Sequence, residues 1–397
     1  MTGRCRSTNG GHVRRMFTRI AATISLLALV GAGATNASAS AAAASDVVGH
    51  LYVNDNTAGT NTIAAFDRHA DGTLTPLHRS PFAAGGAGTG TGIGSQGALQ
   101  RSSDGRYLLA VDAGSNQISV LRIKPGGELR PVEGNPVSSG GLRPVSIAVH
   151  ANLIYVANAG NGGSNYSGFT LNPGGHLRPL AGSTIPLPDG SSPSDVLFNE
   201  DGTRLVGTRV GTSLIDSFTV GADGRLTPAP DSPFAAQGPG PFGSEFRPTD
   251  PTQLFVSNAH GGANNGTVSA FGDASDGTLT SIGSSPFPDF QTAPCWVEIS
   301  HDGQFLFTVN TASNSISRYA IATDGALALL GSTPFKGPTS VGAEDARLAP
   351  NGETLWVVDT GADALSAFAV NGGDLTESPS SPAPLPAGSA PFGIVVT

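Results

Sequence analysis

Residues that could perform chemistry recur at matching positions along this 397-residue sequence, each a few residues after a loop rich in Gly or Pro. Two carboxyl groups can act as general acid and general base, and an arginine can stabilise negative charge that develops during a reaction. A tryptophan offers a flat apolar face to a sugar or lactone ring. These residue types give three catalytic candidates, Glu298, Asp345 and Arg347. The candidates for ligand binding are Asp195, Glu245, Trp296, Gln100 and Arg209.

The spacing of these candidates follows a repeat of about 50 residues, which fills residues 48–397 with seven units. Each unit contains a short apolar segment, followed by a polar turn, an alternating run and a tight turn such as Asp71-Gly72 or Asp223-Gly224. Alternation of apolar and polar residues predicts β-strands, and Asp-Gly between two such runs predicts a hairpin. The apolar segments are Leu51–Asp55, Leu108–Asp112, Ile154–Asn158, Leu205–Arg209, Leu254–Asn258, Leu306–Asn310 and Leu355–Asp359.

Four antiparallel strands per unit predict an all-β fold, a seven-bladed β-propeller. The rungs of a β-helix are much shorter, helical repeats need a 3.6-residue period that is absent, and an immunoglobulin array needs about twice this length per unit. The chain enters at Val48 on the second strand of a blade and ends on Pro391–Thr397, which matches an innermost strand. The C-terminal strand should therefore complete the first blade and remove an open sheet edge.

Alternation within the innermost strands assigns their residues to two sides. Leu99 and Val297 belong to apolar columns that should pack between blades. The other side should face the central channel, with a first layer near the mouth formed by Ser146, Asp195, Trp296 and Asp345. A deeper layer contains Gln100, Glu298 and Arg347, joined by Glu245 if blade five carries a one-residue bulge. All long loops lie at the start of these strands, so we expect the ligand site at that mouth.

Several of these residues also have a structural interpretation. Trp296 could plug the channel rather than stack on a ligand, and the carboxylates could hold a cation or be solvated. The Asp or Asn that ends six of the seven apolar segments predicts a side chain bonded to its own turn backbone. Arg209 replaces it in the seventh and could be a functional substitution or a salt-bridge partner.

Two further motifs favour structural roles. Gly92–Gly97 matches G-x-G-x-x-G, but a strand rather than a helix follows, which predicts a flexible loop. Cys295 lies on the inter-blade side of its strand, which favours a small buried apolar residue over a nucleophile. The histidines are dispersed and show no paired metal spacing, so we predict neither a metal site nor a cofactor.

The N-terminus carries the features of an export signal. Five arginines, the last of them Arg19, precede the apolar run Ile20–Ala32, and the small residues Ala37–Ala39 follow. The run is shorter than the about 20 residues that span a membrane. Arg14-Arg15 partly matches a twin-arginine signal, while Met16 could start an ordinary one, so both export routes stay open. We expect a signal peptide at 1–39, a linker at 40–47, a propeller at 48–397 and a secreted protein.

The charge balance restricts the partners. Of the 21 basic residues, five precede residue 20, and the first of the 30 acidic residues is Asp46, so the rest of the chain carries a net charge of −14. Such a surface repels phosphate backbones and anionic lipid. We therefore expect no nucleic-acid partner and no membrane insertion, but a small-molecule lactone or carbohydrate, or an extracellular partner, bound by a monomer. Because Cys5 leaves with the signal, the single remaining Cys295 cannot form an intrachain disulfide.

The repeats resemble the lactonase family of seven-bladed propellers, which includes 6-phosphogluconolactonases and carboxymuconate cyclases. The resemblance covers residues 48–397 and rests on units such as Ser103–Val120. The chain is similar to a secreted branch that carries Gly94–Leu99 and Cys295–Val297. The resemblance implies His, Arg and Glu residues near the starts of the innermost strands, which bind an anionic lactone and move a proton. The matching columns of this sequence hold Ser194, Asp195, Gly243, Ser244, Trp296, Glu344 and Asp345, so the family's His and Arg are not matched.

Two functions from different classes follow. One is an enzyme that hydrolyses or isomerises a neutral lactone or sugar derivative, with Glu298 or Asp345 as general base, Arg347 stabilising negative charge and Trp296 as an apolar wall. The other is an extracellular propeller that binds or adheres without chemistry. Convergence of the two carboxylates and Arg347 below an open pocket would favour the enzyme.

Overall fold

The computed structural model describes residues 46–336 and 342–397, and these residues form strands and turns. The predicted signal at 1–39 and most of the linker at 40–47 lie outside the described residues. Over the described part of the chain, no helix is long and apolar enough to cross a membrane.

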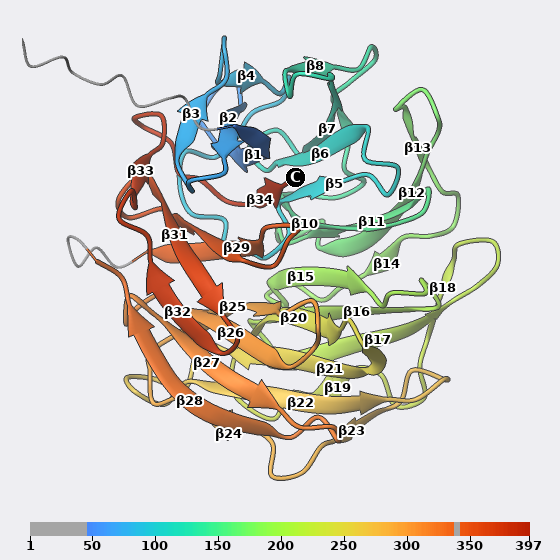
Figure 1. The fold of residues 1–397 in the computed structure, drawn as a ribbon. Coiled ribbons are helices and arrows are strands. Elements are labelled where there is room, and N and C mark those ends of the chain that lie inside the picture. Colours follow the sequence, from blue (N-terminus) through green and yellow to red (C-terminus); the bar gives the residue numbers. More distant parts are fainter. Residues whose placement is uncertain (1–45, 337–341) are drawn as a thin grey trace, which may run out of the picture. The chain divides into compact units, whose positions relative to one another are not determined.

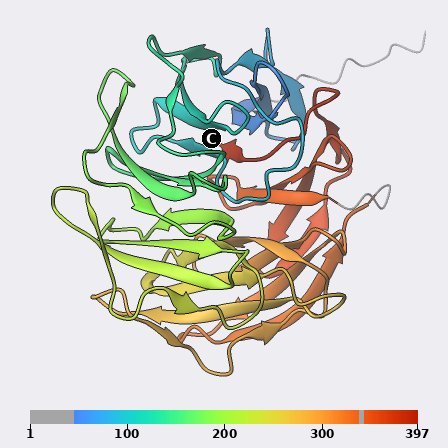
Figure 2. The same ribbon diagram turned by 180° about the vertical axis from the view of Figure 1, so that it is seen from behind.

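Seven antiparallel sheets arranged in a ring make up the fold, as Figures 1 and 2 show from two sides. Each sheet is one blade, with its innermost strand at the channel. The predicted all-β, seven-bladed propeller is confirmed. In blades one, four and five, the Ser-Pro-Phe segments at Ser80, Ser232 and Ser285 divide the outermost strand into two short pieces, because proline cannot donate to the ladder.

The strands of each blade, from the innermost outward, are as follows. Blade one contains β34 (Ile394–Val396), β1 (Val47–Asn54), β2 (Thr62–His69), β3 (Leu74–Pro76) and β4 (Phe82–Ala83). Blade two contains β5 (Leu99–Arg101), β6 (Tyr107–Asp112), β7 (Gln117–Ile123), β8 (Leu129–Pro131) and β9 (Val137–Ser138). Blade three contains β10 (Pro144–His150), β11 (Leu153–Asn158), β12 (Asn165–Leu171), β13 (Leu177–Pro179) and β14 (Ile185–Pro186).

The remaining four blades continue in the same order. Blade four contains β15 (Pro193–Phe198), β16 (Arg204–Arg209), β17 (Leu214–Val220), β18 (Leu226–Pro228) and β19 (Phe234–Ala235). Blade five contains β20 (Pro241–Arg247), β21 (Asp250–Asn258), β22 (Thr267–Asp273), β23 (Leu279–Ser281) and β24 (Phe287–Pro288). Blade six contains β25 (Pro294–Ile299), β26 (Phe305–Asn310), β27 (Ser315–Ile321) and β28 (Leu327–Pro334). Blade seven contains β29 (Ala343–Leu348), β30 (Thr354–Asp359), β31 (Ala364–Asn371), β32 (Asp374–Glu377) and β33 (Ala383–Pro384).

The last strand closes the ring, as predicted. β34 pairs antiparallel with β1, with Val395 opposite Tyr52 and Val396 opposite Leu51. Blade one is thus built from both ends of the described chain, and its innermost strand is not left as an open edge.

The apolar columns fill the space between neighbouring blades. Leu99 and Val297 are each 1% exposed, and they pack with the second and third strands of adjacent sheets. The innermost strands begin after the long loops, on what we call the loop face, and end at tight turns, on what we call the turn face.

The Asp and Asn residues that end the second strands bond differently from the prediction. Asp112 accepts a hydrogen bond of 2.6 Å from the Ser119 hydroxyl on the third strand, and Asn258 donates one of 2.8 Å to Ser269. Turn chemistry was therefore the wrong interpretation for these residues, since they tie two strands of one blade together. Asp359 does accept hydrogen bonds from the turn backbone that follows it.

Candidate functional site

Seven residues, one from each blade, occupy the same register position on the innermost strands and form what we call the lower ring. Each lies opposite the corresponding residue of the second strand, as Glu298 lies opposite Phe307 and Arg347 opposite Trp356. In blade order the lower ring consists of Val395, Gln100, Ala148, Leu197, Glu245, Glu298 and Arg347. Glu245 lies opposite Phe255 in this register, and the pairing of β20 with β21 carries a further shift between Phe246 and Arg247. The condition on which the sequence placed Glu245 in the deeper layer, an irregularity in blade five, is thus met.

The lower ring has a polar side and an apolar side. Glu245, Glu298 and Arg347 come from the consecutive blades five, six and seven. Val395, Ala148 and Leu197 come from blades one, three and four, with Gln100 between them on blade two. A ligand in the ring would therefore meet charge on one side and hydrocarbon on the other.

Glu298 and Arg347 form the centre of the polar side. One carboxylate oxygen of Glu298 lies 3.3 Å from a guanidinium nitrogen of Arg347, and the other accepts a 2.8 Å hydrogen bond from the Leu348 backbone amide. The Glu298 charge raises the pKa of Arg347, so its guanidinium stays protonated. Burial raises the pKa of Glu298, while Arg347 opposes that rise. Glu298 is 5% exposed, and its two partners hold its carboxylate in one orientation.

Glu245 is the carboxyl group of the ring that keeps its proton most readily. Burial, and next the nearby Glu298 charge, raise the pKa of Glu245 to about 8. A carboxyl group that holds a proton near neutral pH, beside a carboxylate paired with an arginine, is an arrangement that general acid and base catalysis can use.

The layer nearer the loop face, which we call the upper layer, consists of Ser146, Asp195, Trp296 and Asp345, none more than 2% exposed. Asp195 accepts hydrogen bonds from the Ser146 hydroxyl (3.2 Å) and from the Ser244 amide and hydroxyl (2.9 and 2.6 Å). One oxygen of Asp345 accepts a 3.4 Å hydrogen bond from the Gly97 amide, while the other has no partner among the described residues. Burial raises the pKa of both Asp195 and Asp345 to about 7.

Residues 92–98 cross the channel above the upper layer. The Gln96 side chain donates to the Ser244 carbonyl (2.8 Å) and accepts from the Val297 amide (3.0 Å), which joins β20 to β25. Its backbone amide donates to the Ser194 carbonyl (3.0 Å). Gly92–Gly97 is a loop, as predicted, and its residues Gln96 and Gly97 are bonded to several innermost strands.

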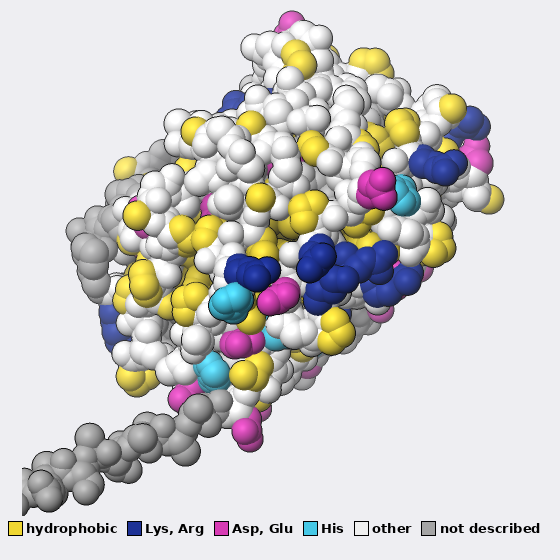
Figure 3. All heavy atoms as spheres, turned by 90° about the horizontal axis from the view of Figure 1, so that it is seen from above, with side chains coloured by type: hydrophobic (Ala, Val, Ile, Leu, Met, Phe, Trp, Pro, Cys, Tyr) yellow, Lys and Arg dark blue, Asp and Glu magenta, His cyan; other side chains and the backbone are white. Residues whose placement is uncertain are grey.

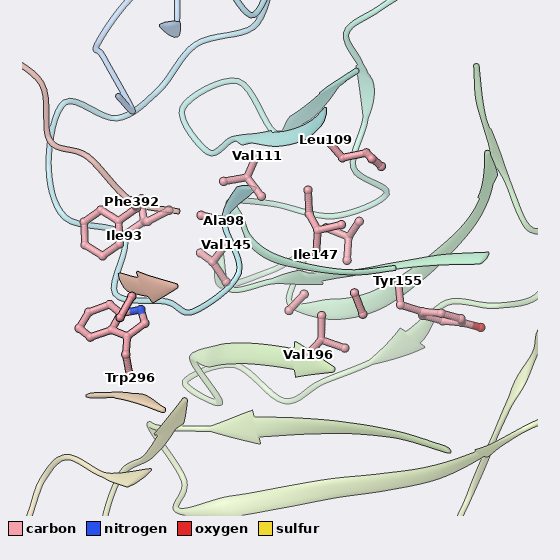
Figure 4. Close-up of a cluster of buried hydrophobic side chains, with 14 of the residues drawn as sticks. Ile93, Ala98, Leu109, Val111, Val145, Ile147, Tyr155, Val196, Trp296 and Phe392 are labelled. Carbon is pink, nitrogen blue, oxygen red and sulfur yellow. The ribbon is translucent and has the colours of Figure 1, made fainter. Parts of the chain in front are cut away.

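Trp296 has the position of a plug. It is 2% exposed, its ring centre lies 5.2 Å from that of Phe242 and 6.3 Å from that of Phe392, and its indole N–H has no partner in the described chain. Figure 4 shows Trp296, Phe392 and Ile93 gathered at this end of the channel. The loop-face mouth, where we expected the ligand, is therefore closed by apolar side chains and by residues 92–98.

The opposite end of the channel is accessible. A pocket of about 200 Å³ is lined by Gln100, Arg101, Arg347, Val395 and Val396, at the ends of the innermost strands of blades two, seven and one. Gln100, Glu245 and Arg347 are partly exposed. The structure thus brings Glu298, Asp345, Arg347, Glu245 and Gln100 together around one channel, but it opens that channel at the turn face.

Arg209 lies elsewhere. It ends β16 and forms a buried ion pair with Asp216, to which it donates from Nε at 2.6 Å and from Nη2. Tyr166 donates a 2.9 Å hydrogen bond to the same carboxylate. Asp216 stands where blade two has Ser119, seven residues after the strand end. The salt-bridge alternative accounts for Arg209 without a ligand.

Sequence reasoning missed Arg101, Val396 and Gln96. The first two lie at strand ends, where alternation does not distinguish the channel side from the rim, and Gln96 belongs to a loop without periodicity. Over residues 46–336 and 342–397, no three His, Cys, Asp or Glu side chains are grouped so as to hold a metal ion.

Comparison with known proteins places these blades among described relatives. Residues 50–198 and 247–395 match the family profile described as "Lactonase, 7-bladed beta-propeller". No curated protein matches the chain at a significant level.

Solved structures share the fold at low sequence identity. A candidate 6-phosphogluconolactonase from Bacteroides uniformis is 21% identical, with a TM-score of 0.70 over 87% of this chain and 98% of that one. The periplasmic gluconolactonase of Pseudomonas aeruginosa is 18% identical, with a TM-score of 0.67 over 87% of this chain and 98% of that one. A protein from Lactobacillus plantarum is 21% identical, with a TM-score of 0.67 over 85% of this chain and 97% of that one.

Proposed function

The chain belongs to the lactonase family of seven-bladed β-propellers, and we propose that it is a secreted hydrolase that opens a neutral lactone or sugar lactone at its lower ring. The observation that carries the proposal is the contiguous placement of Glu245, Glu298 and Arg347 opposite an apolar wall, beside a pocket at the turn face. Two structural neighbours are described as lactonases, one of them periplasmic.

Each residue of the polar side has a role in this reaction. Glu298 accepts a proton from a water molecule while the water oxygen bonds to the lactone carbonyl carbon. Arg347 stabilises the oxyanion that forms. Glu245 donates its proton to the ring oxygen as the carbon–oxygen bond breaks, which its pKa of about 8 permits at neutral pH. The product is a hydroxy acid, and proton transfer from Glu298 to Glu245 restores the starting state. Asp345 is sealed in the upper layer, which favours Glu298 over Asp345 as the base.

A neutral substrate fits this charge distribution. Glu298 compensates the charge of Arg347, so the ring has no spare cation for a second anionic group. The lactone ring would lie against Val395, Ala148 and Leu197, while Gln100 and the carboxyl groups bond its hydroxyls. Trp296 forms the ceiling of the channel above this ring.

Hydrolysis of a lactone panel by the purified protein tests the proposal. We expect turnover of an unphosphorylated aldonolactone, and a decrease in kcat/KM of about 100-fold or more for Glu298→Gln and Arg347→Gln. Glu133→Gln and Arg225→Gln, both on the surface, are matched controls that should keep full activity. Thermal melting of each variant distinguishes lost chemistry from lost fold. Unchanged turnover in folded Glu298→Gln would refute the mechanism.

Two further tests examine the charge of the substrate and the secretion of the protein. Arg101→Gln should change the rate for a neutral lactone little, whereas a strong loss confined to a 6-phosphorylated lactone would show that the substrate is anionic. N-terminal sequencing of the protein from the culture medium tests secretion and cleavage after Ala39.

A non-catalytic extracellular binding propeller is the second candidate. The closed loop-face mouth favours it, because residues 92–98 and Trp296 leave the long loops without a channel beneath them. Absence of turnover across the whole panel, with the protein folded, would favour this candidate.

A further inference from the structure

Two clefts adjoin on the outside of the propeller where blades two and three meet. The larger, about 570 Å³, lies between the turns that follow β5 and β10 and the end of β12. Its uncharged polar lining consists of Ser102, Ser103, Asn152, Thr170 and Asn172. Its two charged residues, Asp104 and Arg106, form an ion pair with each other at 2.6 Å. The smaller, about 270 Å³, is lined by Arg122, Lys124, Arg130 and His176, with Glu133 as its acidic residue.

One aromatic side chain joins the two clefts. The Arg106 guanidinium, in the larger cleft, lies 5.6 Å from the Tyr107 ring centre, and the Arg122 guanidinium, in the smaller, lies 4.8 Å from it. The Tyr107 hydroxyl donates a 3.0 Å hydrogen bond to the Pro173 carbonyl, and Arg122 donates one of 3.4 Å to the Gly174 carbonyl. Both clefts therefore border the same turn at Pro173 and Gly174, and we call the two clefts together the groove.

The cations of the smaller cleft outnumber its single lining carboxylate, that of Glu133. Arg122 and Arg130 stand directly opposite each other on β7 and β8, an arrangement of like charges that destabilises a sheet. Among the described residues, no acidic side chain forms an ion pair with Arg122, Lys124 or Arg130, in contrast to Arg225, which pairs with Asp223 at 2.8 Å. Figure 3, which looks onto blades one and two, shows Lys and Arg side chains gathered together on this side.

This concentration is unexpected in a chain that carries a net charge of −14 beyond residue 45. Uncompensated opposed arginines with a preorganised guanidinium favour binding of an anion. The neighbouring hydroxyl and amide groups suit the hydroxyl groups of a sugar chain.

We propose that the groove between blades two and three binds an acidic polysaccharide, with its sugar rings in the larger cleft and its carboxylates at Arg122, Lys124 and Arg130. None of the lower-ring residues lines the groove, so this site is separate from the proposed hydrolase site. It would attach the protein to an anionic matrix while leaving the channel accessible.

Calorimetry with polygalacturonate oligomers tests the groove. We expect binding that weakens with added salt, and at least about tenfold weaker binding of a neutral galactan of equal length. The triple variant Arg122→Gln, Lys124→Gln, Arg130→Gln should weaken polygalacturonate binding about tenfold or more and leave lactone hydrolysis unchanged. A control triple with the same charge change at exposed positions, Arg79→Gln, Arg143→Gln and Arg225→Gln, should bind as the wild type does.

The larger cleft is tested separately with Ser103→Trp, which introduces bulk at an exposed position. This variant should weaken polygalacturonate binding, because the sugar rings are proposed to lie in this cleft. Equal losses in both triple variants would overturn the proposal, as would absence of polygalacturonate binding or equal affinity for the neutral galactan. Unchanged polygalacturonate binding by Ser103→Trp would overturn the role of the sugar rings.

Discussion

The upper layer and the lower ring of the channel are built from the same strands, two residues apart, yet some of their charged residues differ in how far they are exposed to solvent. Asp195 and Asp345 are at most 2% exposed, under Gln96 and Trp296. Glu245 and Arg347, two residues nearer the turn face along their strands, are partly exposed, and Arg347 lines a pocket. The carboxyl groups are chemically alike, so the difference comes from what covers each end of the channel.

This comparison shows that strand alternation determines which side a residue faces but not whether solvent reaches it. Both layers share the channel side by alternation. The seal above them comes from a loop between blades one and two, whose contacts with β15, β20 and β25 are distant in sequence. Accessibility is thus a tertiary property of the ring.

Removal of Pro391–Thr397 should have the largest effect, because both regions depend on it. Phe392 packs against Trp296 in the upper region, and Val395 and Val396 line the lower pocket. Deletion leaves β1 without its partner and opens the ring. We expect aggregation or loss of cooperative melting, measured by circular dichroism and size-exclusion chromatography. An unchanged melting temperature would contradict the closure.

The repeat made most of the fold predictable from sequence, because each blade repeats the same strand pattern. Closure by the last strand followed from counting strands, whereas the place of Glu245 depended on an irregularity in blade five that the sequence left open. The sequence did not show which end of the channel is open, because Gly92–Gly97 is a loop without periodicity and its contacts cannot be inferred from a residue pattern. The ion pair of Arg209 with Asp216 could not be predicted either, since Asp216 occupies one of the polar positions of an alternating strand and nothing in the sequence distinguishes it from the others.

Substitution of Gln96, above the upper layer, and of Gln100, in the lower ring, compares the stability of the two ends of the channel. Gln96→Ala leaves the Ser244 carbonyl and the Val297 amide without partners in a buried layer, which we expect to cost about 2–4 kcal/mol of unfolding free energy. Gln100→Ala removes a partly exposed side chain from the lower pocket and should cost less than about 1 kcal/mol. Chemical denaturation measures both. Equal costs would show that residues 92–98 do not act as a seal.

The pH dependence of stability should depend on the buried carboxyl groups of the channel that have raised pKa values. The pKa of Glu245 is about 8 against an ordinary 4.5, and those of Asp195 and Asp345 are about 7 against 3.8. At these three groups the folded state binds protons more tightly than the unfolded state, so their contribution to stability falls as pH rises from about 4 to 8.

Glu245→Gln should remove part of this decline. At pH 8 the variant should be more stable than the wild type, by about 1–2 kcal/mol, while near pH 4.5 the two should be similar. Melting curves across this range, with Glu133→Gln as a surface control, measure the effect. A variant that loses stability at pH 8 would show that the Glu245 carboxylate is stabilised by Arg347 more than it is destabilised by burial.

Cys295 provides the smallest effect and the most direct report on the seal. It is 7% exposed and adjoins Trp296, its thiol donates a 3.3 Å hydrogen bond to the Ala293 carbonyl, and burial raises its pKa to about 12. Cys295→Ala should cost on the order of 1 kcal/mol and leave activity unchanged. In the native protein the thiol should react slowly with a maleimide at pH 7, because the reagent cannot easily reach the buried sulfur and because little of the thiol is ionised at that pH. Gln96→Ala should accelerate this labelling and Gln100→Ala should not, since only the first variant loosens the upper layer. Fast stoichiometric labelling of the wild type would mean that the upper layer is open, and the contrast between the two ends of the channel would then disappear.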